Sequence, residues 1–418
     1  MSGHNWAGLM PLLPESNLAS INVTKKVKGI LAGLGVAAML LAGSATAQTP
    51  KLAATPPMGW NTWYAFGCHV TEADVEATVD AMASNGMKAA GYEYVNLDDC
   101  WQGARDAQGH IQSNSRFPDM KALGQYIHSH GFKFGIYSSP GPTTCGGHPG
   151  SYGYENEDAE TYASWGVDFL KYDWCSARKV YQPDQIEAAY EKMHKAILKT
   201  GRPMIYSLCE YGMNAPWIWG PKVGANLWRT SDDVSNRIGF EEYQRMMFVG
   251  FVQDGLQRYA GPGHWNDPDF LQIGNRGLNL DEDKTQMSLW SLLAAPLFSS
   301  TDVTKLSADQ LAVLTNREVI AVDRDPAGIQ GRRISQTGPM EVWAKPLSRG
   351  RMAVGLINAG QAPFPITVNF REIGYSRPVR VRDLWEKKDL GVFKGSYTAT
   401  VAKHGVVLIE IQRQKGTH

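Results

Sequence analysis

The sequence predicts a (β/α)8 barrel followed by a C-terminal antiparallel β-sandwich. From Thr55 to about residue 325, short β-favouring runs alternate with amphipathic helical segments, a pattern typical of a parallel sheet. Polar residues end successive runs at steps of 39, 36 and 37 residues, at Asp98, Tyr137, Asp173 and Glu210. Steps of this length fit one strand and one helix with their loops. Beyond residue 325 the runs become short and alternating, which indicates antiparallel strands.

The barrel strands can be placed in order along the chain, with Trp60 opening the series. Helices are predicted where apolar residues recur at helical spacing. About eight strand–helix units result, so a closed barrel is favoured over a doubly wound sheet. After Trp60 the predicted strands are 94–98, 134–137, 169–173, 204–208, 227–229, 264–267 and 295–298, and the predicted helices are 119–130, 157–165, 184–199 and 241–254.

The last part of the chain has a different pattern. Runs at 340–344, 352–356 and 406–410 are separated by glycine, proline and charged turns. This arrangement predicts a small antiparallel β-sandwich of roughly 90 residues. The segment contains no concentrated cluster of acidic, histidine or cysteine residues, so we expect a structural or lid-supporting role. Sugar binding is the alternative.

The N-terminal residues have the organisation of a secretory signal peptide. Lys25, Lys26 and Lys28 precede an apolar run over 30–42, and Ala45-Thr46-Ala47 supplies a small-x-small cleavage site. The apolar run is too short to span a bilayer comfortably. We therefore expect cleavage near Ala47, a secreted or periplasmic protein, and no membrane attachment afterwards. The expected division is a leader over 1–47, a catalytic barrel over 48–324 and a β-sandwich domain over 325–418.

The charge balance argues against two classes of partner. The chain has 41 Lys and Arg residues and 41 Asp and Glu residues, so its formal net charge is zero. No electrostatic attraction to nucleic acid or to an anionic membrane is therefore expected. The 13 Trp and 17 Tyr residues are many for such a chain, and aromatic rings stack well on sugar rings. Composition thus hints at a carbohydrate partner.

The segment FLKYDWC, over 169–175, is the first candidate for chemistry. Lys171 and Asp173 are two residues apart on a predicted strand, so both side chains project to the same side. An ammonium beside a carboxylate lowers the carboxylate pKa, and an ionised Asp173 suits a nucleophile. The alternative is a structural ion pair at the end of a strand.

Acidic residues are dense at the ends of the predicted strands. Several carboxylates and aromatic rings at one barrel face suit a polyhydroxylated ligand, because carboxylates accept hydrogen bonds from vicinal hydroxyls while rings stack on the sugar. The acidic candidates are Asp98, Asp99, Asp173, Glu210, Asp232, Asp233, Asp267 and Asp269, and the aromatic candidates are Trp60, Trp101 and Tyr137.

Glycoside hydrolysis is the chemistry that these groups can perform. It needs one ionised carboxylate as nucleophile and one carboxylic acid that protonates the leaving oxygen. Asp173 fits the first role, and an aspartate near Arg229 fits the second if its surroundings raise its pKa. The alternative for Asp232 and Asp233 is a helix N-cap.

Other chemistries have little support in the sequence. There is no GxxxxGK[ST], HExxH or GxSxG motif, and the histidines are scattered without a spacing that suggests metal ligands. We therefore expect no metal and no cofactor, although a metal site built from acidic residues alone stays open.

The motifs along the barrel resemble those of glycoside hydrolase family 27, which contains α-galactosidases and α-N-acetylgalactosaminidases. They are long, occur in order and cover 55–323. The matching segments are PPMGWNTW (56–63), NLDDCW (96–101), RFPDMKALGQYIHSHGFKFGIY (116–137), CGGHPGSYGYE (145–155), DFLKYDWC (168–175), WRTSDD (228–233), GPGHWNDPDFLQIGN (261–275) and QMSLWSLLAAPLFSS (286–300).

The resemblance implies a retaining mechanism, a barrel with a C-terminal β-sandwich, and no cofactor. It implies that Asp173 is the nucleophile and that Asp233, four residues beyond Arg229, is the acid/base. It also implies the disulfides Cys68–Cys100 and Cys145–Cys175, with Cys209 free. The implied galactose pocket comprises Trp60, Asp98, Asp99, Tyr137, Cys145, Lys171, Glu210 and Arg229, with Asp267 close by.

Departures from the family pattern bear on specificity. The chain has SSPGP after Tyr137, where many members carry an acidic turn, and CEYG where CEW is commoner. Glu210 with a bulky Met213 is expected to crowd an acetamido group at C2, which favours galactose. Asp98 and Asp99 together favour a hexose with a free 6-hydroxyl.

The expected function is therefore exo-α-galactosidase activity on oligosaccharides or glycoconjugates. The alternatives are an α-N-acetylgalactosaminidase, a β-L-arabinopyranosidase, and a non-catalytic galactose-binding protein on the same fold. Both implied catalytic carboxylates, Asp173 and Asp233, are present, which argues against the last.

Overall fold

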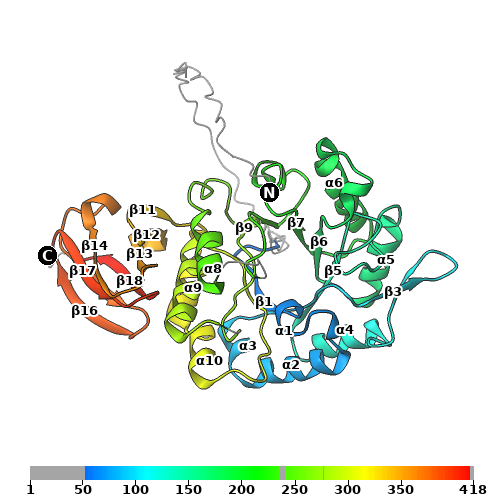
Figure 1. Cartoon of the computed structure of the whole chain (residues 1–418), viewed down its shortest axis with the longest axis horizontal. Coiled ribbons are helices and arrows are strands. Elements are labelled where there is room, and N and C mark those ends of the chain that lie inside the picture. The colour runs from blue at the N-terminus through cyan, green and yellow to red at the C-terminus, as the bar shows by residue number, and fades with distance from the viewer. Residues whose placement is uncertain (1–51, 236–240, 276, 415–418) are drawn as a thin grey trace, which may run out of the picture. The chain divides into compact units, whose positions relative to one another are not determined.

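The computed structural model describes residues 52–235, 241–275 and 277–414. Figure 1 shows strands of a parallel sheet surrounded by helices, followed by a group of antiparallel strands coloured orange to red. The expected leader over 1–47 lies outside the described residues. Within the described part of the chain, no helix is both long enough and apolar enough to cross a membrane.

Eight parallel strands form the barrel, as the sequence predicted. Neighbouring strands pair in the order β10-β1-β2-β5-β6-β7-β8-β9. The backbone N–H of Leu271, just after β9, donates to the carbonyl of Phe298 at 2.8 Å, and Leu271 forms a parallel bridge with Ser299 of β10. This contact joins the two ends of the sheet. The strands are β1 (Met58–Asn61), β2 (Tyr94–Leu97), β5 (Lys133–Ser138), β6 (Phe169–Asp173), β7 (Ile205–Cys209), β8 (Leu227–Arg229), β9 (Trp265–Asp267) and β10 (Leu297–Ser299).

At the end of the barrel where the strands begin, hydrophobic side chains fill the interior, and we call this layer the floor. Large residues near the starts of the strands pack together there, among them Tyr94, Phe169 and Trp265. Because side chains alternate along a strand, residues two and four positions after Phe169 point to the same interior. Lys171 and Asp173 therefore lie in successive layers above the floor, toward the carboxyl end of the sheet.

Helices connect the strands and cover the barrel. Their starts are capped where the sequence offers a suitable side chain: Thr71, Asp119 and Asn279 each accept a backbone N–H of the first turn. The predicted helices correspond to α4, α5, α6 and α8. The helices are α1 (Trp63–Phe66), α2 (Glu72–Ser84), α3 (Met87–Ala90), α4 (Met120–Ser129), α5 (Glu155–Trp165), α6 (Ile186–Lys199), α7 (Pro216–Trp219), α8 (Glu242–Phe251), α9 (Leu280–Leu293), α10 (Ala308–Leu314) and α11 (Arg317–Asp323).

One alternative from the sequence is not found. Asp232 and Asp233 do not cap the helix after β8, because α8 begins at Glu242 with Glu241 at its N-cap. Both aspartates lie instead in the loop that follows β8, at the carboxyl end of the barrel.

The C-terminal strands are antiparallel, as predicted. Six of them pair in the order β11-β12-β13-β18-β15-β16, and β14 pairs with β17. Val354, Val368 and Ile409 contribute to the hydrophobic core of this part. The strands are β11 (Arg332–Thr337), β12 (Met340–Leu347), β13 (Arg351–Asn358), β14 (Phe364–Asn369), β15 (Val379–Asp383), β16 (Lys388–Phe393), β17 (Ser396–Val401) and β18 (Val406–Arg413), and a separate hairpin, β3 (Gln102–Arg105) and β4 (Ile111–Ser113), follows β2.

Candidate active site

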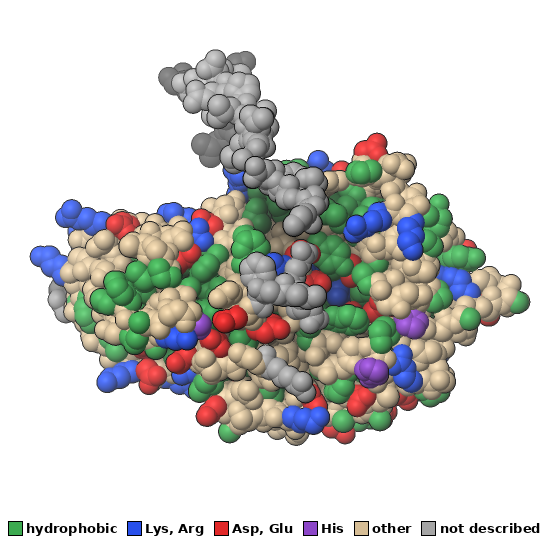
Figure 2. All heavy atoms as spheres, viewed as in Figure 1, with side chains coloured by type: hydrophobic (Ala, Val, Ile, Leu, Met, Phe, Trp, Pro, Cys, Tyr) green, Lys and Arg blue, Asp and Glu red, His purple; other side chains and the backbone are tan. Residues whose placement is uncertain are grey.

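A cavity of about 60 Å³ lies at the carboxyl end of the barrel strands. In the space-filling view, acidic and basic side chains are visible inside the hollow at the centre of the face (Figure 2). Most of the predicted site residues line this cavity, although they come from six different strands or loops. The lining residues are Trp63, Tyr64, Asp98, Asp99, Tyr137, Cys145, Lys171, Asp173, Tyr211, Arg229, Asp233, Asp269 and Phe270.

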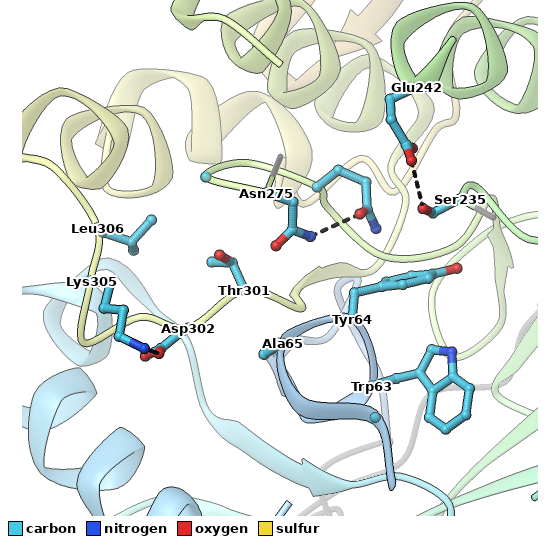
Figure 3. Close-up of a pocket in the computed structure, with 13 residues that line it drawn as sticks. Trp63, Tyr64, Ala65, Ser235, Glu242, Asn275, Thr301, Asp302, Lys305 and Leu306 are labelled. Atoms are coloured by element: carbon cyan, nitrogen blue, oxygen red, sulfur yellow. Dashed lines mark hydrogen bonds and ion pairs between the residues drawn. The ribbon is translucent and has the colours of Figure 1, made fainter. Parts of the chain in front are cut away.

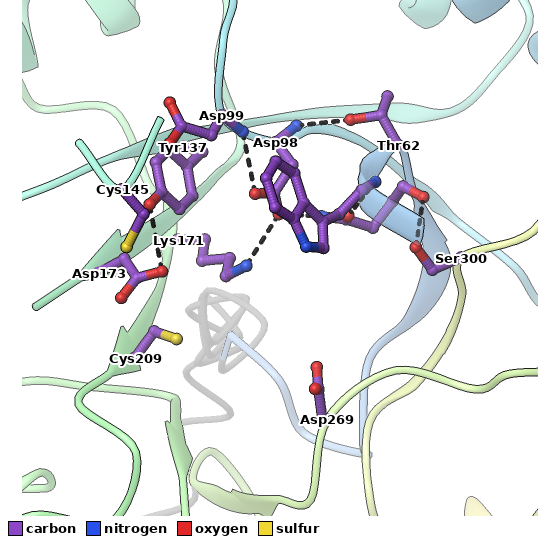
Figure 4. Close-up of polar contacts among 12 residues, drawn as sticks. Thr62, Asp98, Asp99, Tyr137, Cys145, Lys171, Asp173, Cys209, Asp269 and Ser300 are labelled. Atoms are coloured by element: carbon purple, nitrogen blue, oxygen red, sulfur yellow. Dashed lines mark hydrogen bonds and ion pairs between the residues drawn. The ribbon is translucent and has the colours of Figure 1, made fainter. Parts of the chain in front are cut away.

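Lys171 is paired with Asp98, which directly follows β2, two strands away from β6 in the sheet. Lys171 Nζ lies 2.9 Å from Asp98 Oδ2, and Asn61 Nδ2 donates to the same oxygen at 2.8 Å (Figure 4). Burial lowers the pKa of Lys171, but Asp98, through its charge and its hydrogen bond, and the nearby Cys209 and Asp173 together outweigh burial, so the net pKa is raised. A fixed ammonium–carboxylate pair of this kind offers both donors and acceptors to the hydroxyls of a sugar.

Asp99 is held by the backbone. The N–H groups of Cys100 and Gly146 donate to its two oxygens at 2.7 and 2.6 Å. Gly146 follows Cys145, whose disulfide to Cys175 attaches this loop to the end of β6. Burial raises the pKa of Asp99 despite these hydrogen bonds. The disulfide therefore helps to position a carboxylate in the cavity wall.

Asp173 is buried at the end of β6 and accepts two tyrosine hydroxyls. Tyr137 Oη donates to Asp173 Oδ2 at 3.1 Å, and Tyr211 Oη donates to Oδ1 at 2.7 Å. Each carboxylate oxygen therefore has a fixed donor, which sets the orientation of the group. Figure 4 shows the contact with Tyr137.

The pKa of Asp173 differs from the sequence prediction. Burial raises this pKa to about 6, although the Lys171 charge and the Tyr211 hydrogen bond lower it. The prediction that Lys171 holds the pKa low is wrong because desolvation outweighs the ammonium. Asp173 is thus ionised above about pH 6, which keeps it available as a nucleophile at neutral pH.

Arg229 links two carboxylates on the other side of the cavity. Its Nη2 lies 3.2 Å from Asp233 Oδ1 and 3.2 Å from Asp269 Oδ2. Arg229 and Asp269 are almost fully buried, whereas the Asp233 side chain is 50% exposed. Asp269 also accepts the hydroxyl of Tyr64 at 2.9 Å. Asp233 is therefore the carboxylate of this group with access to solvent.

Three residues of the implied galactose pocket do not line this cavity, and neither does the aromatic candidate Trp101, which is fully buried. Trp60 is fully buried, and its Nε1 donates to the carbonyl of Thr301 at 2.7 Å. Glu210 is also fully buried, and burial raises its pKa well above the usual value. Asp267 lines a second, smaller and more enclosed cavity together with Lys171 and Arg229, and burial raises its pKa to about 6.

Five residues outside the predicted pocket line the cavity. Their motifs were visible in the sequence: Trp63 ends PPMGWNTW, Tyr64 follows it, Tyr211 lies in CEYG, and Asp269 and Phe270 end HWNDPDF. Met213, predicted to crowd the sugar, packs against the hydrophobic core instead. Tyr211 therefore replaces Glu210 and Met213 in the wall.

The cysteines follow the implied pattern. Cys68 is bonded to Cys100 and Cys145 to Cys175, while Cys209 is free and buried. Among the described residues, the groups of potential metal ligands are Cys68, Cys100 and His148, and Cys145, Asp173 and Cys175. Each contains a disulfide, whose sulfurs lack the thiolate that binds metal.

Comparison with known proteins matches both parts of the chain. Residues 55–325 match the family model of alpha galactosidase A, and residues 337–411 match that of the alpha galactosidase C-terminal beta sandwich domain. The α-galactosidase A of Cellvibrio japonicus is 41% identical over 407 residues, covering 92% of this chain and 99% of that protein. An α-N-acetylgalactosaminidase of Gallus gallus is 38% identical over 387 residues, covering 85% and 93%.

Solved structures agree with the sequence matches. The crystal structure of α-galactosidase I from Mortierella vinacea has a TM-score of 0.82 to this chain at 37% identity, and the match covers 86% of this chain and 97% of that one. The resemblance to glycoside hydrolase family 27 is confirmed, and the chain belongs to the α-galactosidase family.

Proposed function

We propose that the protein is a retaining exo-α-galactosidase that releases terminal α-linked galactose from oligosaccharides or glycoconjugates. The observation that carries this proposal is the pair of carboxylates in one cavity: Asp173 is 5% exposed and fixed by two hydroxyls, and the Asp233 side chain is 50% exposed. Two carboxyl groups in one cavity, one fixed in orientation and one open to the solvent that supplies the attacking water, suit a nucleophile and an acid/base. The floor around Phe169 closes the cavity below, which suits binding of a chain end.

The proposed reaction has two displacements. In the first, an oxygen of Asp173 attacks the anomeric carbon while the bond to the leaving oxygen breaks and Asp233 gives that oxygen its proton. In the second, water attacks the anomeric carbon, Asp233 takes a proton from the water, and the ester bond to Asp173 breaks. α-Galactose is released, and both carboxyl groups return to their starting states.

The sugar-binding roles follow from the charged groups that face the cavity. Asp98, Asp99 and Lys171 offer fixed acceptors and donors to the galactose hydroxyls. Arg229 keeps its charge between Asp233 and Asp269. For the chain as a whole, we propose a cleaved leader over 1–47, a catalytic domain over 48–324, a β-sandwich domain over 325–418, and a secreted or periplasmic location.

The proposed function predicts a clear order of substrates. In a panel of aryl glycosides, we expect α-galactoside to be hydrolysed far faster than α-N-acetylgalactosaminide, β-L-arabinopyranoside or α-glucoside. Proton NMR of the first product is expected to show α-galactose, because two inversions retain the configuration. β-Galactose as first product would refute the retaining mechanism. Another preferred glycone would overturn the substrate assignment, and galactose binding without turnover would indicate a binding protein.

A further inference from the structure

We propose that a groove beside the galactose cavity binds the sugar units that follow galactose in an α-galactosyl oligosaccharide. This proposal rests on the proposed function. The groove has a volume of about 620 Å³, against about 60 Å³ in the galactose cavity. It therefore has room for more than one hexose beyond the bond that is cleaved.

The groove continues directly from the catalytic cavity. Trp63 and Tyr64 line both, so their rings form a shared wall (Figure 3). Ser235, two residues beyond Asp233, lies on the same groove wall. A leaving group that takes its proton from Asp233 therefore has the groove beside it.

The groove walls have the chemistry of a sugar site. Aromatic rings at one end offer stacking surfaces, and the amide of Asn275 lies farther along. Glu242 accepts the hydroxyl of Ser235 at 3.1 Å, and Lys305 is paired with Asp302 at 2.7 Å. Charges of both signs are present, so the groove fits a neutral, hydroxyl-rich ligand better than an anion.

The test compares raffinose, which carries two further sugars after galactose, with methyl α-galactoside, which carries none. Asn275→Ala removes a side chain that contacts Gln272 and lies in the groove but outside the galactose cavity. We expect kcat/KM for raffinose to fall about fivefold, as for the loss of one neutral hydrogen bond, and kcat/KM for methyl α-galactoside to stay within about twofold. Ala65→Phe, which fills the groove, is also expected to lower kcat/KM for raffinose more than kcat/KM for methyl α-galactoside.

Asn156→Ala, an exposed change on α5, is the matched control and is expected to leave kcat/KM unchanged for both substrates. Equal effects of Asn275→Ala on both substrates, or no effect on either, would overturn the groove assignment while leaving the proposed function intact. If the unmodified enzyme hydrolyses neither substrate, the proposed function itself fails.

A second observation assigns Arg245 as a positioning residue for Asp233, and this too rests on the proposed function. The peptide unit between Asp233 and Val234 is held on both edges. Arg245 Nε donates to the carbonyl of Asp233 at 2.8 Å, and the N–H of Val234 donates to Asp269 Oδ2 at 2.8 Å. Arg245 is 7% exposed on α8, so a buried side chain from a helix fixes the backbone of the acid/base.

This double restraint matters because the Asp233 side chain is half-exposed. Its carboxylate has Arg229 at 3.2 Å, and an oxygen in this position must meet a leaving group that differs between substrates. Fixing the peptide reduces the range of positions that the carboxylate can take, and proton transfer needs hydrogen-bond distance. Arg245 therefore acts through Asp233 without touching the substrate.

Leaving-group dependence separates this role from a general structural one. We expect Arg245→Gln to lower kcat/KM about tenfold for methyl α-galactoside, which needs protonation, and less than about twofold for 2,4-dinitrophenyl α-galactoside, which does not. Arg245→Lys keeps one donor and should recover part of the loss. Arg258→Gln, at an exposed position beyond α8, is the matched control.

Thermal unfolding of each variant shows whether the fold is intact. Equal losses for both leaving groups would overturn the positioning role of Arg245, as would unchanged activity toward methyl α-galactoside in a folded Arg245→Gln protein.

Discussion

Asp173→Asn is expected to remove turnover and, at neutral pH, to raise the melting temperature. The amide has the shape of the carboxylate but cannot attack the anomeric carbon, and loss of a catalytic nucleophile lowers kcat by about 10⁶-fold in a well-studied protease. A loss of at least about 10⁴-fold is expected here. Measurement of kcat on an aryl α-galactoside tests this, with Asp184→Asn, an exposed change, as the control.

The stability effect follows from the direction of the pKa change. Burial raises the pKa of Asp173 from 3.8 to about 6, so the folded protein holds this proton more tightly than the unfolded chain does. Stability from the protonated form is present below about pH 4 and is lost as pH rises through about 6. The raised pKa corresponds to at most about 3 kcal/mol at neutral pH.

Calorimetry at two pH values tests the stability effect. Asn carries no charge, so Asp173→Asn should gain a few degrees in melting temperature at pH 7.5 and little near pH 4. A folded Asp173→Asn protein with full activity would show that another group is the nucleophile. If Asp173→Asn and the unmodified protein had equal melting temperatures at both pH values, the buried charge would not oppose folding.

The barrel was predictable because its signal is local. Each strand is a short buried run and each helix has an apolar face, and these periods can be read without knowing what lies beside them. Asp98, Lys171 and Asp173 could be placed together for the same reason, since parallel strands end at one edge of the sheet. The closing contact at Leu271 was not predictable, because a single bridge after a three-residue strand has no periodicity.

The features of the site that the sequence did not predict depend on contacts with residues from other strands and on the burial of side chains. Spacing along β6 placed Lys171 beside Asp173, but its nearest charged partner is Asp98, 73 residues earlier. The pKa of Asp173 depends on how much water the folded barrel excludes from this side chain, and the spacing of residues in the sequence does not contain that information. Tyr211 and Phe270 lie in loops, where a shift of one or two residues decides which side chain reaches the cavity.

Asp233→Ala is expected to make activity depend strongly on the leaving group. Without the acid, kcat/KM for methyl α-galactoside should fall by about 10²- to 10⁴-fold, whereas 2,4-dinitrophenyl α-galactoside should lose far less, because its leaving group departs without a proton. Asp232→Ala is the comparison: Asp232 is the adjacent aspartate and does not line the cavity, but it lies 3.8 Å from Arg245, so only a small loss is expected. Strong loss in Asp232→Ala and none in Asp233→Ala would reverse the acid/base assignment.

Azide extends the same experiment to stereochemistry. In Asp233→Ala the glycosyl-enzyme forms from the dinitrophenyl substrate but reacts slowly with water, because no base activates the water. Azide needs no base, so it should raise kcat and yield α-galactosyl azide after two inversions at the anomeric carbon. In Asp173→Ala, azide would occupy the place of the missing carboxylate, and a single inversion would yield β-galactosyl azide. Opposite anomers from the two variants would assign the two carboxylates independently, whereas the same anomer from both would rule out a covalent intermediate on Asp173.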